Sequence, residues 1–291
     1  SLPKIADGMT RSVSEMKAAA NLVPPPDPAY RRFAYNPLLR TPLVQTNRGI
    51  FAPVPELIYD AVSPGVLYHR GRDAWGNGFT HDLGARVQQY VGRQLRLLAP
   101  EFEVVPEILY QGDQLSADWF LMSEELLVIV ECKASRASLE ARLGTQALDT
   151  QFKRDISKAK RQIERTAQLV ATHHPDFAVV SGNRRVIGLI ITAEPFYLLA
   201  ASHSKELLDG TPTLLGSLRD LEHLTTLDPL EAARQLHDIA GDPEKRTWPL
   251  GNALDVPPNS ETHNPILQAI WDRSPLAEPV ARRLEQGTAS R

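Results

Sequence analysis

The sequence predicts an α/β fold with a central mixed β-sheet, flanked by helices and extended at both ends by Pro-rich segments. Two observations support this prediction. Segments with apolar residues three and four apart, typical of helices, alternate with short apolar segments typical of strands. Proline is concentrated at the ends, with nine of 23 in residues 1–60 and seven in residues 241–291. Because proline interrupts regular structure, we expect most helices and strands between these ends.

The elements follow in chain order from these patterns. At the N-terminus we expect a helix over residues 4–22 and an extended connector over Pro24–Pro28. Apolar residues three and four apart predict an amphipathic helix over residues 80–98. Three strands are expected next, over residues 102–110, 118–122 and 126–133. The remaining predicted elements are a helix over 151–173, strands over 185–192 and 213–218, a helix over 229–239 and a capped helix over 264–271.

The strand over residues 126–133 is apolar on both faces until its end, so we expect it in the centre of the sheet. Around it, the sequence predicts three parts: an N-terminal extension (1–75), an α/β core (76–225) and a helical, Pro-rich C-terminal extension (226–291).

The composition is typical of a globular protein, with 42% hydrophobic and 23% charged residues among 291. The longest mostly apolar stretch, Val186–Ala201, includes Glu194 and Pro195 and is shorter than the roughly 18–20 apolar residues that span a bilayer. We therefore expect no membrane partner. A single Cys and the lack of Asn-x-Ser/Thr sequons favour a cytoplasmic location. Residue 1 is Ser, and no leader pattern follows it, which favours a processed N-terminus or a piece of a longer protein.

Two carboxylates and a Lys form the main candidate site. Glu131 and Lys133 are two apart at the end of a predicted strand, so they project on one face while Cys132 projects on the other. If residues 123–126 form a hairpin loop, Asp118 lies directly opposite Glu131, with Cβ atoms about 4.5–5.5 Å apart. Two carboxylates at that spacing repel each other unless a cation lies between them, and hard oxygen ligands suit Mg²⁺ or Mn²⁺.

A structural alternative stays open, in which Glu131 and Lys133 form an ion pair at the end of the strand. The same short pattern, an acidic residue two before a Lys, also occurs at Glu15 and Lys17. That copy lies in a predicted surface helix, where residues two apart do not share a face. The Glu131 copy differs because it ends a strand that is buried on both faces, where an unpaired charge costs several kcal/mol.

The segment Ser116-Ala117-Asp118-Trp119-Phe120-Leu121, followed by Val128-Ile129-Val130-Glu131-Cys132-Lys133-Ala134, resembles the PD-(D/E)XK, or restriction-endonuclease-like, nuclease superfamily. The resemblance covers about residues 76–225 and implies a restriction-endonuclease-like core. It also implies that Asp118 and Glu131 hold a divalent metal and that Lys133 positions or activates the attacking water. Ala117 stands where the superfamily's name has Pro.

The preceding helix is similar to the superfamily pattern Phe-Gly-x-x-Phe-Glu-x-Tyr-Val, with Gln88 in place of the acidic residue. Gly84, Gln88 and Gly92 are four apart, and the two small residues permit a close approach to the sheet, so we expect Gln88 to face the site. A neutral amide binds Mg²⁺ less well than a carboxylate, so the metal affinity is expected to be reduced. The alternative is a surface Gln.

The helix over 151–173 also resembles the superfamily's helix after the motif, in which Gln162 corresponds to a Gln that reaches toward the site. Four basic residues lie near one stripe of this helix: Arg154, Lys158, Arg161 and Arg165. The net charge of the chain is −3, so binding to nucleic acid requires such a local patch. A solvated charged face is the alternative.

The candidate metal site and the superfamily resemblance together predict a Mg²⁺-dependent nuclease that hydrolyses DNA, and the resemblance favours a role in restriction or anti-phage defence. A catalytically inactive module for nucleic-acid binding or complex assembly is the second hypothesis, because Gln88 replaces the acidic residue. A third hypothesis is a nuclease that stays silent until another domain or subunit activates it. The partners considered besides DNA are therefore a second copy in a homo-oligomer or an activating domain or subunit.

Overall fold

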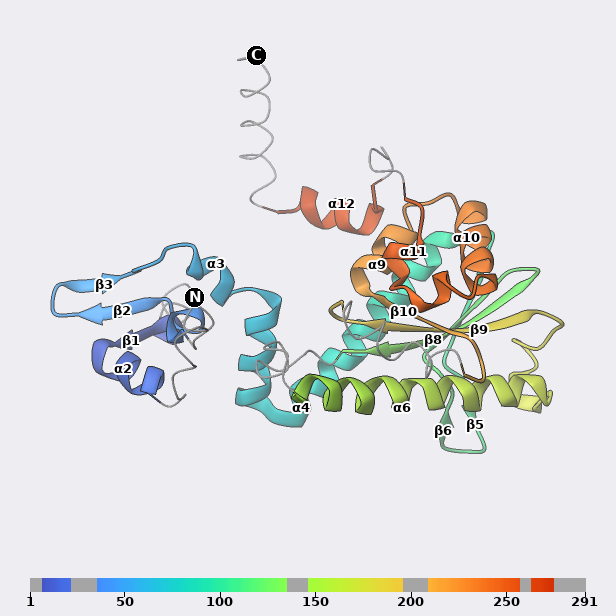
Figure 1. The fold of residues 1–291 in the computed structure, drawn as a ribbon, viewed down its shortest axis with the longest axis horizontal. Coiled ribbons are helices and arrows are strands. Elements are labelled where there is room, and N and C mark those ends of the chain that lie inside the picture. The colour runs from blue at the N-terminus through green and yellow to red at the C-terminus, as the bar shows by residue number, and fades with distance from the viewer. Residues whose placement is uncertain (1–6, 22–35, 135–145, 196–208, 257–262, 275–291) are drawn as a thin grey trace, which may run out of the picture. The chain divides into compact units, whose positions relative to one another are not determined.

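A computed structural model describes residues 7–21, 36–134, 146–195, 209–256 and 263–274, with backbone alone for residue 64 and for residues 146–153. The chain divides into two compact units, unit 1 from Ser1 to Thr80 and unit 2 from His81 to Arg291 (Figure 1). The domain limits that the sequence suggests, at residues 75 and 225, stay a prediction. No described helix combines the length and the hydropathy needed to cross a membrane.

Unit 1 contains a three-stranded sheet in the order β1-β2-β3, with β1 parallel to β2 and β2 antiparallel to β3. Its elements are β1 (Thr10–Ser12), α2 (Val13–Asn21), the 3₁₀ helix η2 (Pro37–Leu39), β2 (Leu43–Thr46), β3 (Gly49–Phe51) and α3 (Leu57–Ala61).

The helix predicted over residues 4–22 is interrupted: residues 7–9 and 13–21 are helical as predicted, but residues 10–12 form strand β1. The physical reason is a capping box. The Ser12 hydroxyl accepts a hydrogen bond from the Glu15 amide at 3.2 Å, and Glu15 Oε2 accepts one from the Ser12 amide at 2.8 Å. This reciprocal pair starts helix α2 at Val13. The predicted connector over Pro24–Pro28 lies outside the described residues.

Helix α4 (Pro64–Leu95) runs from unit 1 into unit 2 and is interrupted at Gly76, where the backbone has φ 55° and ψ −133°. Only glycine adopts such a conformation readily, so Gly76 separates two helical halves. The second half corresponds to the predicted helix over residues 80–98, whose last turn is the 3₁₀ helix η3 (Arg96–Leu98).

The sheet of unit 2 confirms the predicted mixed α/β architecture. Its order is β10-β9-β8-β7-β4, in which β8, β9 and β10 are parallel while β7 runs antiparallel to both of its neighbours. The strands are β4 (Glu103–Pro106), β7 (Trp119–Met122), β8 (Leu126–Lys133), β9 (Arg185–Thr192) and β10 (Thr213–Ser217). As predicted, β8 is central, and its residues 126–131 are all buried.

The strand predicted over residues 102–110 is broken into two. β4 ends at Pro106, which lacks an N–H to continue the ladder. The chain then forms a separate two-stranded hairpin of β5 (Leu109–Tyr110) and β6 (Gln114–Leu115). The hairpin turns at Gln111 and Gly112, both with positive φ.

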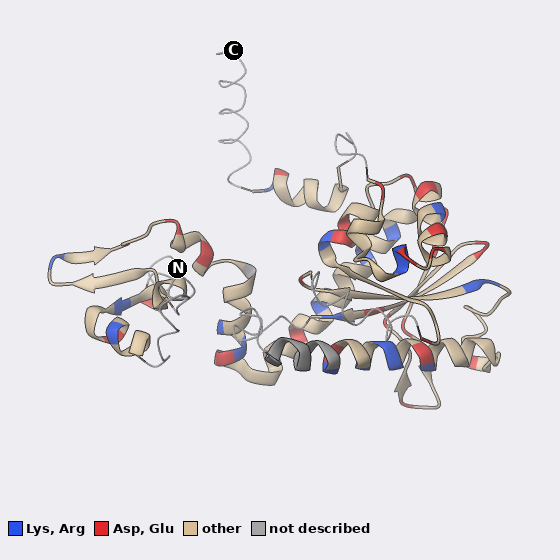
Figure 2. Cartoon of the chain, in the orientation of Figure 1, with Lys and Arg blue, Asp and Glu red and all other residues tan. Residues whose placement is uncertain are grey.

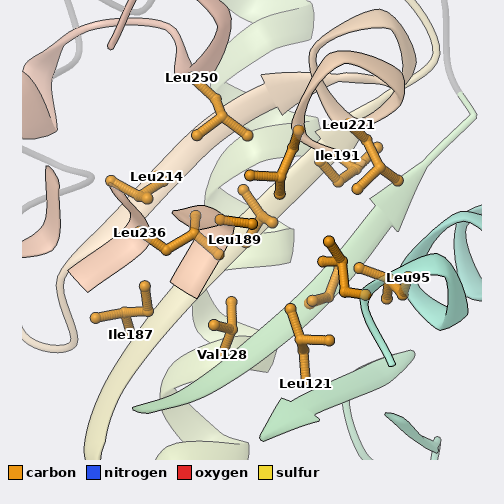
Figure 3. Packing of buried hydrophobic residues seen from close by; sticks show 14 of the residues in the cluster. Leu95, Leu121, Val128, Ile187, Leu189, Ile191, Leu214, Leu221, Leu236 and Leu250 are labelled. Carbon is orange, nitrogen blue, oxygen red and sulfur yellow. The ribbon is translucent and has the colours of Figure 1, made fainter. Parts of the chain in front are cut away.

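Two apolar clusters cover the two faces of this sheet. Figure 3 shows the first cluster, where α4 and the C-terminal helices pack on alternate sheet residues such as Leu121, Val128 and Leu189. The second cluster lies beneath α6 (Gln146–Ala171), which packs through Ile156 and Ile163. The other helices among the described residues of unit 2 are η4 (Pro175–Phe177), α9 (Leu218–Leu224), α10 (Pro229–Gly241), η5 (Lys245–Thr247), α11 (Leu250–Ala253) and α12 (Pro265–Asp272).

A buried polar network connects α12 to α4 and α9. The Gln94 side chain is fully buried, and its Oε1 accepts hydrogen bonds from Thr225 Oγ1 at 3.0 Å and from Asn264 Nδ2 at 2.6 Å. Asn264 is also the N-cap of α12, since its Oδ1 accepts from the Ile266 and Leu267 amides. A buried amide needs such partners, so the network fixes the position at which α12 leaves the core.

Gly92 allows α4 to approach the sheet closely. A Cβ added there would lie 2.1 Å from a ring carbon of Trp119. The Trp119 ring is held on two sides, because its Nε1 donates to the Gln88 carbonyl at 2.9 Å and the Arg96 guanidinium lies over the ring at 4.8 Å. Gly84 has no such neighbour within 4 Å.

We expect Gly92→Ala to lower the free energy of unfolding by about 1–3 kcal/mol, because the indole must move. Gly84→Ala, on the same helix, is the matched control and should raise stability by roughly 0.5–1 kcal/mol through helix propensity alone. Urea denaturation of both variants measures the two effects. Equal stability of the two variants would contradict the close packing at Gly92.

Candidate active site at the ends of strands β7 and β8

The two candidate carboxylates lie at the ends of neighbouring antiparallel strands. β7 and β8 pair from Met122–Leu127 to Trp119–Val130, so the predicted pairing of residue 122 with residue 127 is confirmed. One further step of this register brings Asp118 opposite Glu131. β8 begins at Leu126 as predicted, and the Leu126 carbonyl accepts a hydrogen bond from the Ser123 amide at 2.9 Å, so the connecting turn is residues 123–125 rather than 123–126.

Alternation along β8 places Glu131 and Lys133 on the α6 side of the sheet. Leu127 and Ile129 belong to the apolar cluster beneath α6, whereas Cys132 packs against the opposite cluster. Burial raises the pKa of the Cys132 thiol, so this residue remains a protonated packing group.

Glu131 is 3% exposed, and its two oxygens have different surroundings. Oε1 accepts a hydrogen bond from Lys133 Nζ at 2.6 Å, so the ion pair considered as the structural alternative is present. Oε2 is buried and has no hydrogen-bond partner among the described residues. A buried oxygen without a partner is costly, and a partner from outside the chain would relieve that cost.

Asp118 is tied to β8 through the backbone. Its Oδ2 accepts a hydrogen bond from the Cys132 amide at 2.6 Å, which holds the carboxylate beside the last residues of the strand. Burial raises the pKa of Asp118, while the Cys132 hydrogen bond and the charge of Lys133 oppose the shift. The pKa of Glu131 rises to about 7, mainly through burial and next through the charge of Asp118, with Lys133 opposing.

A third carboxylate, Glu107, was missed by the sequence analysis. β4 and β7 pair up to Pro106–Trp119, and one further step of the register puts Glu107 opposite Asp118. The charge of Glu107 contributes to the raised pKa of Asp118. Gln88 Nε2 donates to Glu107 Oε1 at 3.1 Å, so Gln88 faces this end of the sheet and contacts Glu107. One feature of the sequence could have pointed to Glu107: it directly follows Pro106, and a proline often marks the end of a strand.

Hydrogen bonds from α6 hold the segment before Asp118. Gln162 Nε2 donates to the Ser116 carbonyl at 2.8 Å, and the Ala117 amide donates to Thr166 Oγ1 at 3.0 Å. The Ser116 hydroxyl in turn accepts from the Ile108 amide at 2.8 Å, next to Glu107. Gln162 therefore contacts the backbone that carries Asp118 rather than the carboxylate itself.

The four basic residues predicted to form a stripe on α6 are all exposed: Arg154, Lys158, Arg161 and Arg165. Two of them also contact neighbours, because Arg154 pairs with Asp155 at 2.9 Å and the Arg165 guanidinium lies 5.5 Å from the centre of the Tyr110 ring. Figure 2 shows both basic and acidic residues along α6.

Lys160, also on α6, is not part of this stripe. It is 6% exposed and donates to Thr213 Oγ1 at 3.1 Å, so it connects α6 to the start of β10.

The residues at the site fit a hard divalent cation such as Mg²⁺ in part. Asp118 and Glu131 offer carboxylate oxygens from adjacent strands, and Glu131 Oε2 is buried without a partner among the described residues. Within the described ranges, no group of three or more His, Cys, Asp or Glu side chains is arranged to hold a metal ion. Mg²⁺ commonly uses one or two carboxylates with waters and substrate phosphate oxygens, so a pair of carboxylates agrees with its usual ligand set.

Comparisons with protein-family models, with curated proteins and with solved structures found no match for this chain.

We expect Glu131→Gln to stabilise the protein at pH 8 and not at pH 5. The pKa of Glu131 is about 7 in the folded state against 4.5 as its ordinary value. The Glu131 side chain therefore contributes most to stability when it is protonated, below about pH 4.5. This contribution is lost as the pH rises through 7 and the buried carboxyl group ionises. A neutral Gln avoids that loss, which should raise the melting temperature at pH 8 by about 3 °C in EDTA.

The control is Glu124→Gln, an exposed carboxylate in the turn between β7 and β8. Thermal unfolding of both variants from pH 5 to pH 8 measures the difference. A melting temperature of Glu131→Gln that stays below the wild type across this range would show that the Lys133 pair outweighs the burial of the carboxylate.

Proposed function

We propose that unit 2 contains a restriction-endonuclease-like core that hydrolyses phosphodiester bonds of DNA with Mg²⁺. The observation that carries this proposal is the arrangement at the ends of β7 and β8. Asp118 and Glu131 are opposite in register, Lys133 donates to Glu131, and the second Glu131 oxygen is buried without a partner among the described residues. The resemblance of residues 116–134 to the nuclease motif supports the same conclusion.

Each residue has a role that follows from its chemistry. Asp118 and Glu131 would hold the cation, with Mn²⁺ as a substitute for Mg²⁺. When bound, the cation supplies Lewis-acid polarisation of a phosphate oxygen and a lower pKa for a ligated water. The Lys133 ammonium lies beside Glu131 with its side chain 18% exposed, so it can orient a water and stabilise negative charge that develops on the phosphate.

The exposed stripe of α6 supports DNA as the partner. α6 lies on the side of the sheet toward which Glu131 projects, since its residues share an apolar cluster with Leu127 and Ile129. Lys158 and Arg161 are exposed on this helix and are available to phosphates. A role in restriction or defence is also proposed, and its support is the resemblance of residues 116–134 to the nuclease superfamily.

A second candidate function is a nucleic-acid-binding or assembly module without catalysis. The observation that favours it is the pairing of the site's polar groups with one another. Lys133 Nζ donates a hydrogen bond to Glu131, and Gln88 Nε2 donates one to Glu107 Oε1 at 3.1 Å. In such a module these side chains would stay paired with one another and bind no cation. The exposed basic stripe of α6 would then bind the nucleic acid.

We expect wild-type protein to nick supercoiled plasmid in Mg²⁺ or Mn²⁺ and not in EDTA. Asp118→Asn and Lys133→Ala should each reduce the rate at least about a hundredfold, because each removes charge from the reacting centre. Circular dichroism confirms that the variants fold. Glu124→Gln is the control and should cleave normally. Cleavage that survives both site variants would overturn the proposal, and DNA binding without cleavage in any metal would favour the second function.

We expect Gln88→Glu to make the fold more dependent on Mg²⁺. A carboxylate at residue 88 would face Glu107 at hydrogen-bonding distance, and repulsion should destabilise the metal-free protein by on the order of 2 kcal/mol. Mg²⁺ should recover more of the melting temperature than in the wild type. Gln89→Glu, the exposed neighbour on α4, is the matched control. The same metal response in both variants would place Gln88 outside the cation site.

A further inference from the structure

Unit 1 contains a pocket that the proposed nuclease site does not use. Its volume is about 490 Å³, within the range of small-molecule sites. Residues in or next to β1, α2, η2 and the first half of α4 line it: Gly8, Arg11, Glu15, Met16, Ala19, Pro37, Arg40, Thr41 and Arg70.

Three guanidinium groups from distant parts of the sequence meet at this pocket. Arg11 comes from β1, Arg40 follows η2, and Arg70 comes from α4. Arg70 is part-buried and donates a hydrogen bond to the Arg40 carbonyl, which fixes it in place. The pKa of Arg70 is lowered by burial and then by the charges of Arg40 and Arg11, so the three cations are close enough to repel each other.

The acidic residues near the pocket compensate only part of this charge. Asp73 pairs with Arg40 at 2.6 Å. Glu15 lines the pocket, but its Oε2 accepts hydrogen bonds from the amide and the hydroxyl of Ser12. Arg11 Nη1 donates to the Thr10 carbonyl at 3.0 Å, and Arg70 donates to the Arg40 carbonyl. Among the described residues neither guanidinium forms an ion pair within 4.0 Å, so their remaining N–H groups are available to an anion.

The rest of the lining determines what size and kind of anion fits. Met16, Ala19 and Pro37 add apolar surface to the lining, while the Thr41 hydroxyl donates to the Pro37 carbonyl at 3.2 Å. The volume exceeds that of a bare phosphate ion. A guanidinium fork matches phosphate oxygens in two parallel hydrogen bonds, and apolar side chains suit the organic part of a phosphate ester.

We propose that this pocket binds a phosphate monoester, with Arg11 and Arg70 on the phosphate group and Met16, Ala19 and Pro37 against its organic part. The phosphate can come from a free nucleotide or from the phosphorylated end of a nucleic-acid strand. This inference concerns unit 1 and does not depend on the proposed nuclease activity of unit 2.

The test is isothermal titration calorimetry of the full chain at low ionic strength with three probes. These are adenosine monophosphate, a short single-stranded oligonucleotide with a 5′-phosphate and the same oligonucleotide with a 5′-hydroxyl. Arg11→Gln and Arg70→Gln should each weaken binding of the monophosphate about tenfold. Arg72→Gln is the matched control, since Arg72 is exposed on the same helix but does not line the pocket.

Each outcome decides the proposal. Tighter binding of the phosphorylated oligonucleotide than of the hydroxyl form, lost in Arg11→Gln, supports the strand end as the source. Binding of the mononucleotide alone, lost in the same variant, supports a free nucleotide. No binding of any phosphorylated probe, or equal weakening in Arg72→Gln, overturns the proposal. Because Arg70→Gln removes a structural hydrogen bond, the exposed Arg11 provides the variant that leaves the fold intact.

Discussion

The Glu131 carboxylate is buried at the end of a strand that is itself buried on both faces. An isolated charge in such a place costs several kcal/mol, and the chain offsets this cost only in part. Lys133 donates a hydrogen bond to Glu131 Oε1, whereas Glu131 Oε2 has no partner among the described residues. Asp118 lies opposite Glu131 in the strand register. Burial of β8 stabilises unit 2, and the same burial keeps its last carboxylate in an unfavourable state that a cation would relieve.

Elements on both sides of the sheet hold Asp118 and Glu131 in position. On one side α4 approaches closely at Gly92, and the Gln88 carbonyl anchors the Trp119 ring beside Asp118. On the other side Gln162 of α6 binds the Ser116 carbonyl. Gln162, which the superfamily resemblance associates with the site, thus contacts the backbone at Ser116, two residues before Asp118.

Much of the core could be predicted because local patterns determine it. The limits of β8 and β9 are as predicted, since apolar runs bounded by polar residues leave little choice of strand. Strand β1 was missed, because three polar residues pair with a strand more than thirty positions away and have no pattern of their own. Glu107 was missed for a similar reason: its position opposite Asp118 depends on the pairing of β4 with β7, which sequence periodicity does not reveal.

The antiparallel half of the sheet has a consequence for how the site assembles. Glu107, Asp118 and Glu131 lie within 25 consecutive residues and come together through neighbouring strands, β4 with β7 and β7 with β8. The parallel strands β9 and β10 require long crossovers and close much larger loops. Contacts between residues near in sequence form at a lower entropic cost. The register that brings the three carboxylates together therefore depends on short-range connectivity and not on the long crossovers that lead to β9 and β10.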